Sequence, residues 1–451
     1  MSKSKQILPL LFTGVMMGAL DIAIIGPAFP AIQDTYHVSD RMLPWLLNIY
    51  VLFNLVSTPV MGKFSDLYGR KWIYILDIFL FAVGSLVVVL SGSFTMVLAG
   101  RAIQGFGAGG IFPVATAVIG DKVPQEKQGS ALGLIGAVFG LAFIIGPILG
   151  GTLLSLHWKY IFVINIPIAV LIIIWASRVL PSERIAEKIS IDWPGILALV
   201  SALTLYALSV NQVDSRHILQ SIGDPWILIP YLVSVVLMVF FYFRELRVES
   251  PVINPHLLRS KQLMIVYLLA FGAGLAQLAG LYLPSIASLF FGVSNSEASF
   301  MLLPLVIALF ISAPIAGKLV DTIGSKNVLI IGQVVMVIGL AVFGFYFKER
   351  TGFYAAEALT GAGIAFVVGS PLRYIMNQET ETSDRASGQA VLTLFTSTGQ
   401  LSSAAMVGAI IASMGGGMRG YRTAFQVLMY ISIVLLFVSF GLRNSSDEEE
   451  S

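Results

Sequence analysis

Long apolar stretches recur along almost the whole chain, and this feature constrains the fold most. Most of them reach the roughly 20 apolar residues that an α-helix needs to cross a bilayer. The charge content agrees, because only 12% of the residues are charged, about half the share usual in a soluble protein. The sequence therefore excludes a soluble enzyme, a nucleic-acid-binding protein and a disordered chain.

The stretches predict fourteen transmembrane helices and hence an all-α membrane protein. A first group of six is expected at residues 7–31, 43–62, 72–91, 94–120, 129–156 and 158–180. An inserted pair follows at 192–212 and 225–243, and a second group of six at 263–291, 297–317, 326–347, 352–376, 386–414 and 421–442. The predicted segments are an N-terminal bundle at 1–188, two inserted helices at 189–246, a C-terminal bundle at 247–443 and an acidic tail at 444–451.

The placement of Lys and Arg predicts that both chain ends are cytoplasmic. Of the 27 basic residues, nineteen fall in segments on the expected cytoplasmic side and seven on the other side, while Arg101 lies within the membrane. Cytoplasmic loops carry the excess of Lys and Arg in membrane proteins. An even number of helices agrees with this topology. We expect a multi-pass protein of the cytoplasmic membrane.

A pattern of fifteen residues occurs twice in the chain. The segments 57–71 and 312–326 agree at Ser, Pro, Gly, Lys, Asp, Gly and Lys with a constant offset of 255 residues. Each copy falls at the cytoplasmic end of the second helix of its group of six. Two related bundles with a binding site between them form an architecture for alternating access. The repeat therefore predicts a transporter.

The first copy of the repeat resembles the loop between helices two and three of the major facilitator superfamily. It reads Gly62-x-x-x-Asp66-x-x-Gly69-Arg70-Lys71. The glycines allow helices to approach closely, and Asp66 is expected to accept hydrogen bonds from the start of the third helix. The resemblance implies the fold of that superfamily, with two six-helix bundles and two inserted helices.

Further motifs resemble the drug:proton antiporter branch of that superfamily with fourteen helices. The first-helix motif has Gly26 and Pro27 where an Asn and a Val are usual. For the glycine-rich motif in the fifth helix, close packing of small residues is the alternative interpretation. The matching motifs are Leu20-Asp21-x-x-x-Ile25-x-x-Ala28-x-Pro30, Arg101-x-x-Gln104-Gly105 and the antiporter motif Gly146-Pro147-x-x-Gly150-Gly151.

The sequence also indicates the energy source. It contains no Gly-x-x-x-x-Gly-Lys-Ser/Thr loop for ATP phosphates, so coupling to an ion gradient remains. The chain has no Cys, and its four His residues are not spaced as metal ligands. We therefore expect no cofactor other than a proton gradient, no metal and no enzymatic activity.

Four charged residues are expected inside the membrane, where a charge is costly unless it pairs or functions. Helix rise places Asp21 and Arg101 at one level. Burial disfavours a charged acid and a nearby Arg favours it, so Asp21 is expected to bind a proton or the substrate, with a structural ion pair as the alternative. Glu357 lies at the repeat position of Arg101, 256 residues later, and is expected to attract a cation or carry a second proton. The alternative for Glu357 is a carboxylate at the outer rim.

The remaining intramembrane acid, Asp77, is expected to belong to the cytoplasmic gate. Its position predicts pairing with Arg70 or Lys71, and Asp121 is expected to bond to Arg70. The resemblance implies that this cluster stabilises the outward-open state.

The second copy of the repeat differs from the first at one charged position. It has Asp321 but carries Ser325 in place of Arg, so its gate is expected to be weaker. Polar residues that can line a central pocket are Asn48, Tyr50, Asn54, Gln104, Asn165 and Gln277.

These features together predict a secondary active multidrug exporter that exchanges lipophilic cationic or zwitterionic compounds for protons by alternating access. The open alternative is a dedicated exporter of one metabolite, a metal–tetracycline chelate or a monovalent cation, again in exchange for protons. The expected partners are small-molecule drugs or metabolites, protons and membrane lipids, with no nucleic acid. A monomer is expected.

Overall fold

The computed structural model describes residues 3–25, 28–38, 42, 45–154, 156–182, 192–213, 218–249, 251–279, 282–293, 295–346, 349–415 and 417–443. Within these ranges, thirteen helices are long and apolar enough to cross a membrane, and a shorter apolar helix at Lys261–Gln277 stands where the fourteenth is expected. The described residues form no strand. A helix satisfies its backbone hydrogen bonds internally, as a bilayer requires. The predicted all-α membrane fold is confirmed.

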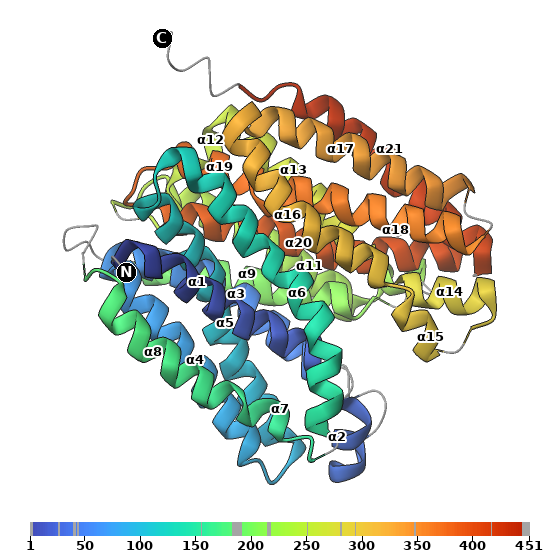
Figure 1. The fold of residues 1–451 in the computed structure, drawn as a ribbon, viewed down its shortest axis with the longest axis horizontal. Helices are drawn as coiled ribbons and strands as arrows, with labels where there is room; N and C mark the ends of the chain where they lie inside the picture. The colour runs from blue at the N-terminus through green and yellow to red at the C-terminus, as the bar shows by residue number, and fades with distance from the viewer. Residues whose placement is uncertain are drawn as a thin grey trace.

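In its described part, the N-terminal bundle contains six long helices and two short ones, which Figure 1 shows in blue to green. α3 and α4 are joined at Gly69, whose φ of 95° favours glycine. The helices are α1 (Lys3–Ile25), α2 (Phe29–Tyr36), α3 (Trp45–Tyr68), α4 (Arg70–Val89), α5 (Phe94–Lys122), α6 (Gln128–Leu154), α7 (Tyr160–Val163) and α8 (Asn165–Val179), with a short 3-10 turn at Gln125–Lys127.

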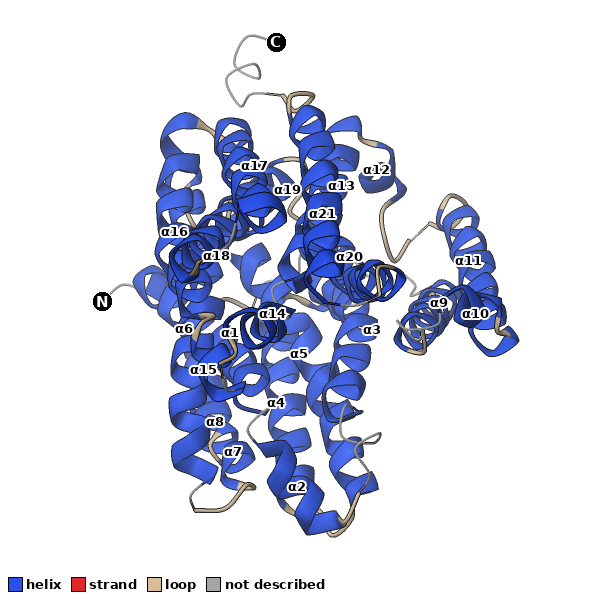
Figure 2. Ribbon diagram, turned by 90° about the vertical axis from the view of Figure 1, so that its right-hand side faces the viewer, coloured by secondary structure: helices blue, strands red, loops and turns tan. Residues whose placement is uncertain are grey.

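Two long inserted helices, with a short one between them, connect the bundles: α9 (Trp193–Asn211), α10 (Ile218–Gly223) and α11 (Pro225–Glu245). Figure 2 shows α9 and α11 standing beside the two bundles. α9 packs against α3 and α20, while α11 packs on α9 and leaves many apolar side chains exposed. The inserted pair is therefore attached to both bundles through α9.

The C-terminal bundle repeats the arrangement of the first. Its fourth predicted span, 352–376, consists of α18, a π-helical segment and α19. The elements are α12 (Pro255–Arg259), α13 (Lys261–Ala279), α14 (Leu283–Phe291), α15 (Asn295–Phe300), α16 (Leu303–Ile323), α17 (Ser325–Ala341), a π-helical segment (Val342–Tyr346), α18 (Arg350–Ile364), a second π-helical segment (Ala365–Gly369), α19 (Pro371–Gln378), α20 (Arg385–Ser413) and α21 (Gly417–Ser439).

Several predicted spans begin or end differently from the observed helices. The span 7–31 is divided between α1 and α2, the span 263–291 between α13 and α14, and the span 297–317 between α15 and α16. A proline occupies the first turn of α2, α14 and α16. Proline lacks a backbone N–H and is therefore suited to start a new helix, which hydropathy alone does not reveal. The segment boundaries near residues 188 and 246 stay a prediction, and the tail 444–451 lies outside the described residues.

The duplication is visible in the packing of the two bundles. A Cβ atom built on Gly105 in α5 would collide with the backbone of Tyr50 in α3, and one on Gly361 in α18 with the backbone of Leu305 in α16. Gly105 and Gly361 are 256 residues apart, and Tyr50 and Leu305 are 255 apart. Equivalent helices therefore meet at equivalent glycines in the two halves.

The most extensive contacts between the two bundles are those of α3 with α20 and of α6 with α16, and α5 also contacts α19 and α20. A Cβ atom on Gly62 would lie 2.7 Å from the Cβ atom of Ala390 in α20. Gly317 in α16 lies just as tightly against Gly129 of α6. Small residues let membrane helices approach closely, and these two contacts bring the cytoplasmic ends of the bundles together.

Candidate functional site

A buried ion pair joins α1 and α5 inside the N-terminal bundle. Arg101 is 0% exposed and donates from Nη1 to Asp21 Oδ2 at 2.5 Å. Its Nε donates to the carbonyl oxygen of Leu46 at 3.1 Å, and its Cζ lies 4.4 Å from the centre of the Tyr50 ring. The structure therefore brings together the two charges that helix rise placed at one level.

Neutral side chains complete a polar network around this ion pair. Gln104 Nε2 donates to Asp21 Oδ1 at 3.3 Å and Asn165 Nδ2 donates to the same oxygen at 3.1 Å. Gln104 Nε2 also donates to Ser85 Oγ at 2.7 Å, and Arg101 Nη1 donates to Gln104 Oε1 at 3.0 Å. The network thus collects side chains from α1, α4, α5 and α8. Ser85 was not predicted, since a lone serine in an apolar helix carries no sequence signal.

The antiporter motif lies against α1 beside Asp21. A Cβ atom on Gly146 would be 2.6 Å from the Cβ atom of Ala23, and one on Gly150 would be 3.3 Å from Ile24, whereas Gly151 faces open space. Pro147 lies between them in α6. Close packing of this motif therefore holds α6 near the acidic residue. Residues 26 and 27 of the first-helix motif lie outside the described residues.

Asp66, at the cytoplasmic end of α3, caps a helix of the other bundle. It accepts hydrogen bonds from Ala386 N at 3.1 Å, Ser387 N at 2.8 Å and Ser387 Oγ at 2.5 Å, all at the start of α20. It also pairs with Arg70. The start of the third helix supplies the expected hydrogen bond through the side chain of Arg70, while the backbone donors come from α20. A helix N-terminus attracts a carboxylate, but the packing of α20 decides which N-terminus is nearest.

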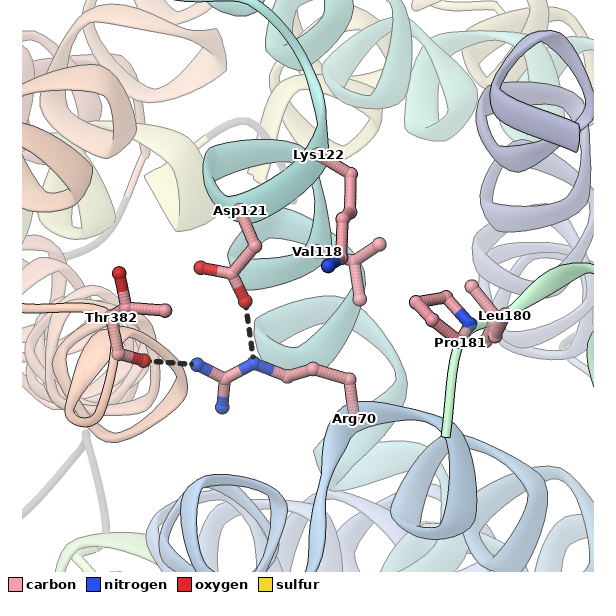
Figure 3. Close-up of a pocket in the computed structure, with 7 residues that line it drawn as sticks. All are labelled: Arg70, Val118, Asp121, Lys122, Leu180, Pro181 and Thr382. Carbon is pink, nitrogen blue, oxygen red and sulfur yellow. Dashed lines mark hydrogen bonds and ion pairs between the residues drawn. The ribbon is translucent and has the colours of Figure 1, made fainter. Parts of the chain in front are cut away.

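Arg70 and Asp121 extend this contact across the seam between the bundles, as Figure 3 shows. Arg70 donates from Nε to Asp121 Oδ2 at 3.0 Å and from Nη2 to the carbonyl oxygen of Thr382 at 2.7 Å. Arg385 of α20 donates to Asp121 Oδ1 at 2.9 Å. One carboxylate is therefore held by an arginine from each bundle, and the expected contact between Arg70 and Asp121 is present.

Asp321 forms the matching contact at the second copy of the repeat. Its carboxylate accepts hydrogen bonds from Gly129 N and Ser130 N, each at 2.8 Å, and from Ser130 Oγ. These donors lie at the start of α6 in the N-terminal bundle. Within the described residues Asp321 pairs with no arginine. Each repeat aspartate therefore caps a helix of the opposite bundle.

Asp77 does not join the gate cluster, contrary to the sequence-based prediction. It is fully buried, and neither of its oxygens has a hydrogen-bond partner within the described residues. Asp77 lies about 10 Å deeper than Arg70 along α4, at 1.5 Å per residue, and faces Gly110 of α5. Lys71 instead donates to the carbonyl oxygen of Ser177 at 2.7 Å.

Glu357 lies within the C-terminal bundle and not at its rim. The side chain is 0% exposed, and neither oxygen has a hydrogen-bond partner in the described part of the chain. The residue 255 positions after Asp21 is Ala276, so the second bundle has no acid at the position of Asp21. Beside it, Gln277 accepts a hydrogen bond from Gln400 at 2.6 Å. The structure therefore keeps Glu357 and Gln277 apart from the network around Asp21.

The other predicted pocket residues take different positions. Tyr50, Gln104 and Asn165 belong to the buried network, whereas Asn48 and Asn54 are half-buried on α3. Hydrogen bonds between described residues connect neither of these two side chains to Asp21.

One arginine was assigned to the wrong environment by the sequence. Arg373 is one of the nineteen basic residues counted in segments on the cytoplasmic side, but it lies in α19 and is 4% exposed. The packing of α19 against α5 and α20 buries it.

Comparison with known proteins agrees with this architecture. The model of the Major Facilitator Superfamily matches residues 11–288 and 263–451. The MFS-type transporter YfiU of Bacillus subtilis (strain 168) is 33% identical over 380 residues, which cover 83% of this chain and 73% of YfiU. The multidrug transporter protein MdtP of the same organism is 28% identical, with 91% of this chain and 76% of MdtP covered. The riboflavin transporter RibZ of Clostridioides difficile (strain 630) is 26% identical, with 74% and 72% covered.

A solved structure supports the fold independently of close sequence similarity. The human organic anion transporter MFSD10 superposes with a TM-score of 0.74 at 16% identity, with 97% of this chain and 99% of that chain covered. At this identity the likeness shows the fold alone. Because the family model covers nearly the whole chain and the helices span a membrane many times, the protein is a multi-pass transporter of the plasma membrane and belongs to the major facilitator superfamily.

Proposed function

We propose that the protein is a secondary active exporter that exchanges lipophilic cationic or zwitterionic compounds for protons. The observation that carries this proposal is the fully buried ion pair of Asp21 and Arg101 within a transporter fold. Ionisable groups at membrane depth are expensive, and proton relays are among the functions for which they are kept. Asp21 is the member of the pair that can gain and lose a proton.

Protonation of Asp21 changes the stability of the surrounding network. It removes the negative charge that faces Arg101. The guanidinium then has only neutral contacts, with the carbonyl oxygen of Leu46, the amide of Gln104 and the ring of Tyr50. A buried charge without its counter-ion is strongly destabilising. Protonation therefore favours a conformation in which Arg101 meets water or a substrate, and so couples proton binding to movement of α1 against α5.

The contacts of Asp66 and Asp321 provide the second state that exchange requires. Both carboxylates tie the cytoplasmic end of one bundle to the other bundle, so the cytoplasmic path is closed in this conformation. Breaking these contacts opens the cytoplasmic side. The Asp21 network need not break at the same time, because all of its side chains lie in the N-terminal bundle. A transporter that never opens both sides at once exchanges its two substrates and does not leak.

The relatives bear on the range of substrates. MdtP is named as a multidrug transporter, which favours a broad set of lipophilic compounds. RibZ is named as a riboflavin transporter, and this relative favours a second candidate, the dedicated exporter of one metabolite.

The proposal is tested in liposomes that contain the purified full-length protein. An imposed pH gradient is expected to drive ethidium uptake or release by the wild type, and Asp21→Asn is expected to abolish this gradient-driven flux. Exchange of labelled ethidium without a gradient should continue in Asp21→Asn, because the uncharged Asn resembles the protonated aspartate and leaves the conformational change possible. Glu357→Gln is examined in the same assay to learn whether a second acid contributes.

Glu126→Gln is the matched control, since it changes an exposed acid in the turn before α6. This control should transport as the wild type does. Full gradient-driven flux in a folded Asp21→Asn protein would refute the role of Asp21. Flux of a single metabolite without flux of ethidium or other lipophilic cations would favour the dedicated exporter.

A further inference from the structure

Arg373 is a buried cation at the seam between the bundles that has no acidic partner. It lies on α19, is 4% exposed, and no carboxylate of a described residue comes within ion-pair distance. By contrast, Arg70 and Arg385 each pair with Asp121, and Arg101 pairs with Asp21. A buried, uncompensated charge is costly, so its retention calls for a function.

Neutral groups hold the Arg373 side chain in place from one edge. Its Nη1 donates to Gln389 Oε1 at 3.1 Å and to Thr393 Oγ1 at 3.5 Å, both on α20. Gln389 Nε2 in turn donates to the carbonyl oxygen of Arg373 at 2.8 Å. The guanidinium is therefore oriented by α20, and its buried Nε is left without a hydrogen-bond acceptor among the described residues.

The face of the guanidinium is covered by the other bundle. Its Cζ lies 4.0 Å from the centre of the Phe112 ring on α5. One turn further along α19, Asn377 donates to the carbonyl oxygen of Thr116, which is also on α5. Arg373 thus lies one helical turn, about 6 Å, inside the contacts that close the cytoplasmic side. Separation of the bundles there would uncover the face of the guanidinium that Phe112 covers.

An oxyanion next to an aromatic ring matches this environment. A carboxylate binds an arginine through two parallel N–H donors, and the pair of Nε and Nη2 offers that fork. A guanidinium face also stacks on aromatic rings, as it does here on Phe112. A substrate that carries both groups can place its ring on the guanidinium face in place of Phe112. Its carboxylate can then accept hydrogen bonds from Nε and Nη2.

We propose that Arg373 binds the carboxylate of an aromatic, amphipathic substrate when the cytoplasmic side is open. This inference rests on the proposed function and narrows its substrate class to compounds with an acidic group, including zwitterions.

The test measures equilibrium binding of three probes to the full-length protein in nanodiscs. Norfloxacin carries an aromatic ring, an amine and a carboxylate, its ethyl ester lacks only the acid, and ethidium is a cation without an acid. Arg373→Gln is expected to weaken norfloxacin binding about tenfold or more, as the loss of a charge-assisted pair implies, and to leave the other two probes within about twofold. Arg373→Lys should fall between, because it keeps the charge but not the fork.

Phe112→Leu and Arg443→Gln separate recognition of the acid from a structural role of the gate. Phe112→Leu removes the stacking ring but not the cation. It should therefore change the affinity for norfloxacin and for its ester by the same factor and leave the preference for the acid intact. Arg443→Gln, which changes an exposed basic residue after α21, should bind all probes as the wild type does. Equal losses for norfloxacin and its ester in Arg373→Gln would overturn the proposal, as would equal affinity of the wild type for the two.

Two further measurements are needed. One tells whether Arg373 binds chloride instead of the substrate carboxylate, and the other separates failure of the proposed exporter from failure of the Arg373 proposal. Exchange of chloride for gluconate should leave norfloxacin binding unchanged, whereas a gain of about tenfold would identify chloride as the occupant and overturn the proposal. Absence of gradient-driven ethidium flux in the wild type refutes the exporter alone, since acid-selective binding that depends on Arg373 would still stand.

Discussion

The two aspartates of the repeat make comparable contacts with the opposite bundle, and this leads to a quantitative prediction. Asp66 accepts from two backbone N–H groups and one hydroxyl at the start of α20, and Asp321 accepts from the same kinds of donor at the start of α6. Substitution of either by Asn keeps one acceptor oxygen but loses the charge and presents an amide to N–H donors. Both substitutions should open the cytoplasmic side.

The size of the effect follows from the contacts that cross the seam. Loss of one charge-assisted hydrogen bond costs about 1.5–3 kcal/mol, and loss of the carboxylate at a helix N-terminus about 0.3–1 kcal/mol. We take about 2 kcal/mol for each site, which shifts the closed-to-open equilibrium about 30-fold. The pair of Arg70 with Asp66 lies within one bundle and contributes little to this difference, since it survives opening.

The double variant Asp66→Asn/Asp321→Asn should add these effects, because the two sites lie on different helix pairs. The expected sum is about 4 kcal/mol, or roughly 1,000-fold. Spin labels at Tyr68→Cys and Asn327→Cys, exposed at the cytoplasmic ends of α3 and α17, report the separation of the bundles. The chain has no native cysteine, so labelling is specific.

The distance distributions decide between two accounts of the gate. Equal shifts for the two single variants support capping of the helices as the source of closure. If Asp321→Asn leaves the distribution unchanged while Asp66→Asn shifts it, the arginine cluster closes the gate and the reasoning above is refuted. That result would instead agree with the weaker second gate predicted from Ser325. Glu126→Gln should match the wild type in either case.

Two packing contacts give further predictions. Gly146→Ala places a Cβ atom 2.6 Å from that of Ala23 and should cost about 1–3 kcal/mol of stability, seen as a lower melting temperature and lower flux, whereas Gly151→Ala, which faces open space, should not. An unchanged melting temperature for Gly146→Ala would contradict close packing of the motif. Tyr206→Phe and Ser402→Ala remove the 2.7 Å hydrogen bond between α9 and α20, and a double-mutant cycle on unfolding should give a coupling of about 1 kcal/mol. A coupling of zero would mean that this bond does not fasten the inserted pair.

The features predicted correctly from the sequence depend on local properties of the chain. Hydropathy gives the spans, and helix rise gives the depth of Asp21 in its helix and of Arg101 in another. Each of these estimates uses only the residues of one helix. The repeat gives the equivalence of Asp66 and Asp321 because duplication preserves spacing. None of these inferences requires knowledge of how distant helices pack.

The features that the sequence did not reveal depend on contacts between distant segments. The donors to Asp66 lie about 320 residues further along the chain, in α20. Asp77 was expected near Arg70 because the two are close in sequence, but α4 carries its carboxyl deeper into the bundle. Arg373 was counted with the basic residues of the cytoplasmic side, but the approach of α5 and α20 buries it. Tertiary packing decides each of these environments.

The two bundles share their backbone contacts but differ in how their buried charges are balanced. In the N-terminal bundle, Asp21 and Arg101 form an ion pair, and only Asp77 among its buried acids lacks a hydrogen-bond partner within the described residues. In the C-terminal bundle, Glu357 and Arg373 have no such partners among the described residues. Repeat symmetry preserves the close glycine contacts between equivalent helices, at Gly105 in one bundle and Gly361 in the other. Under the proposed function, the difference in buried charges would let the N-terminal bundle respond to protons and the C-terminal bundle select the substrate.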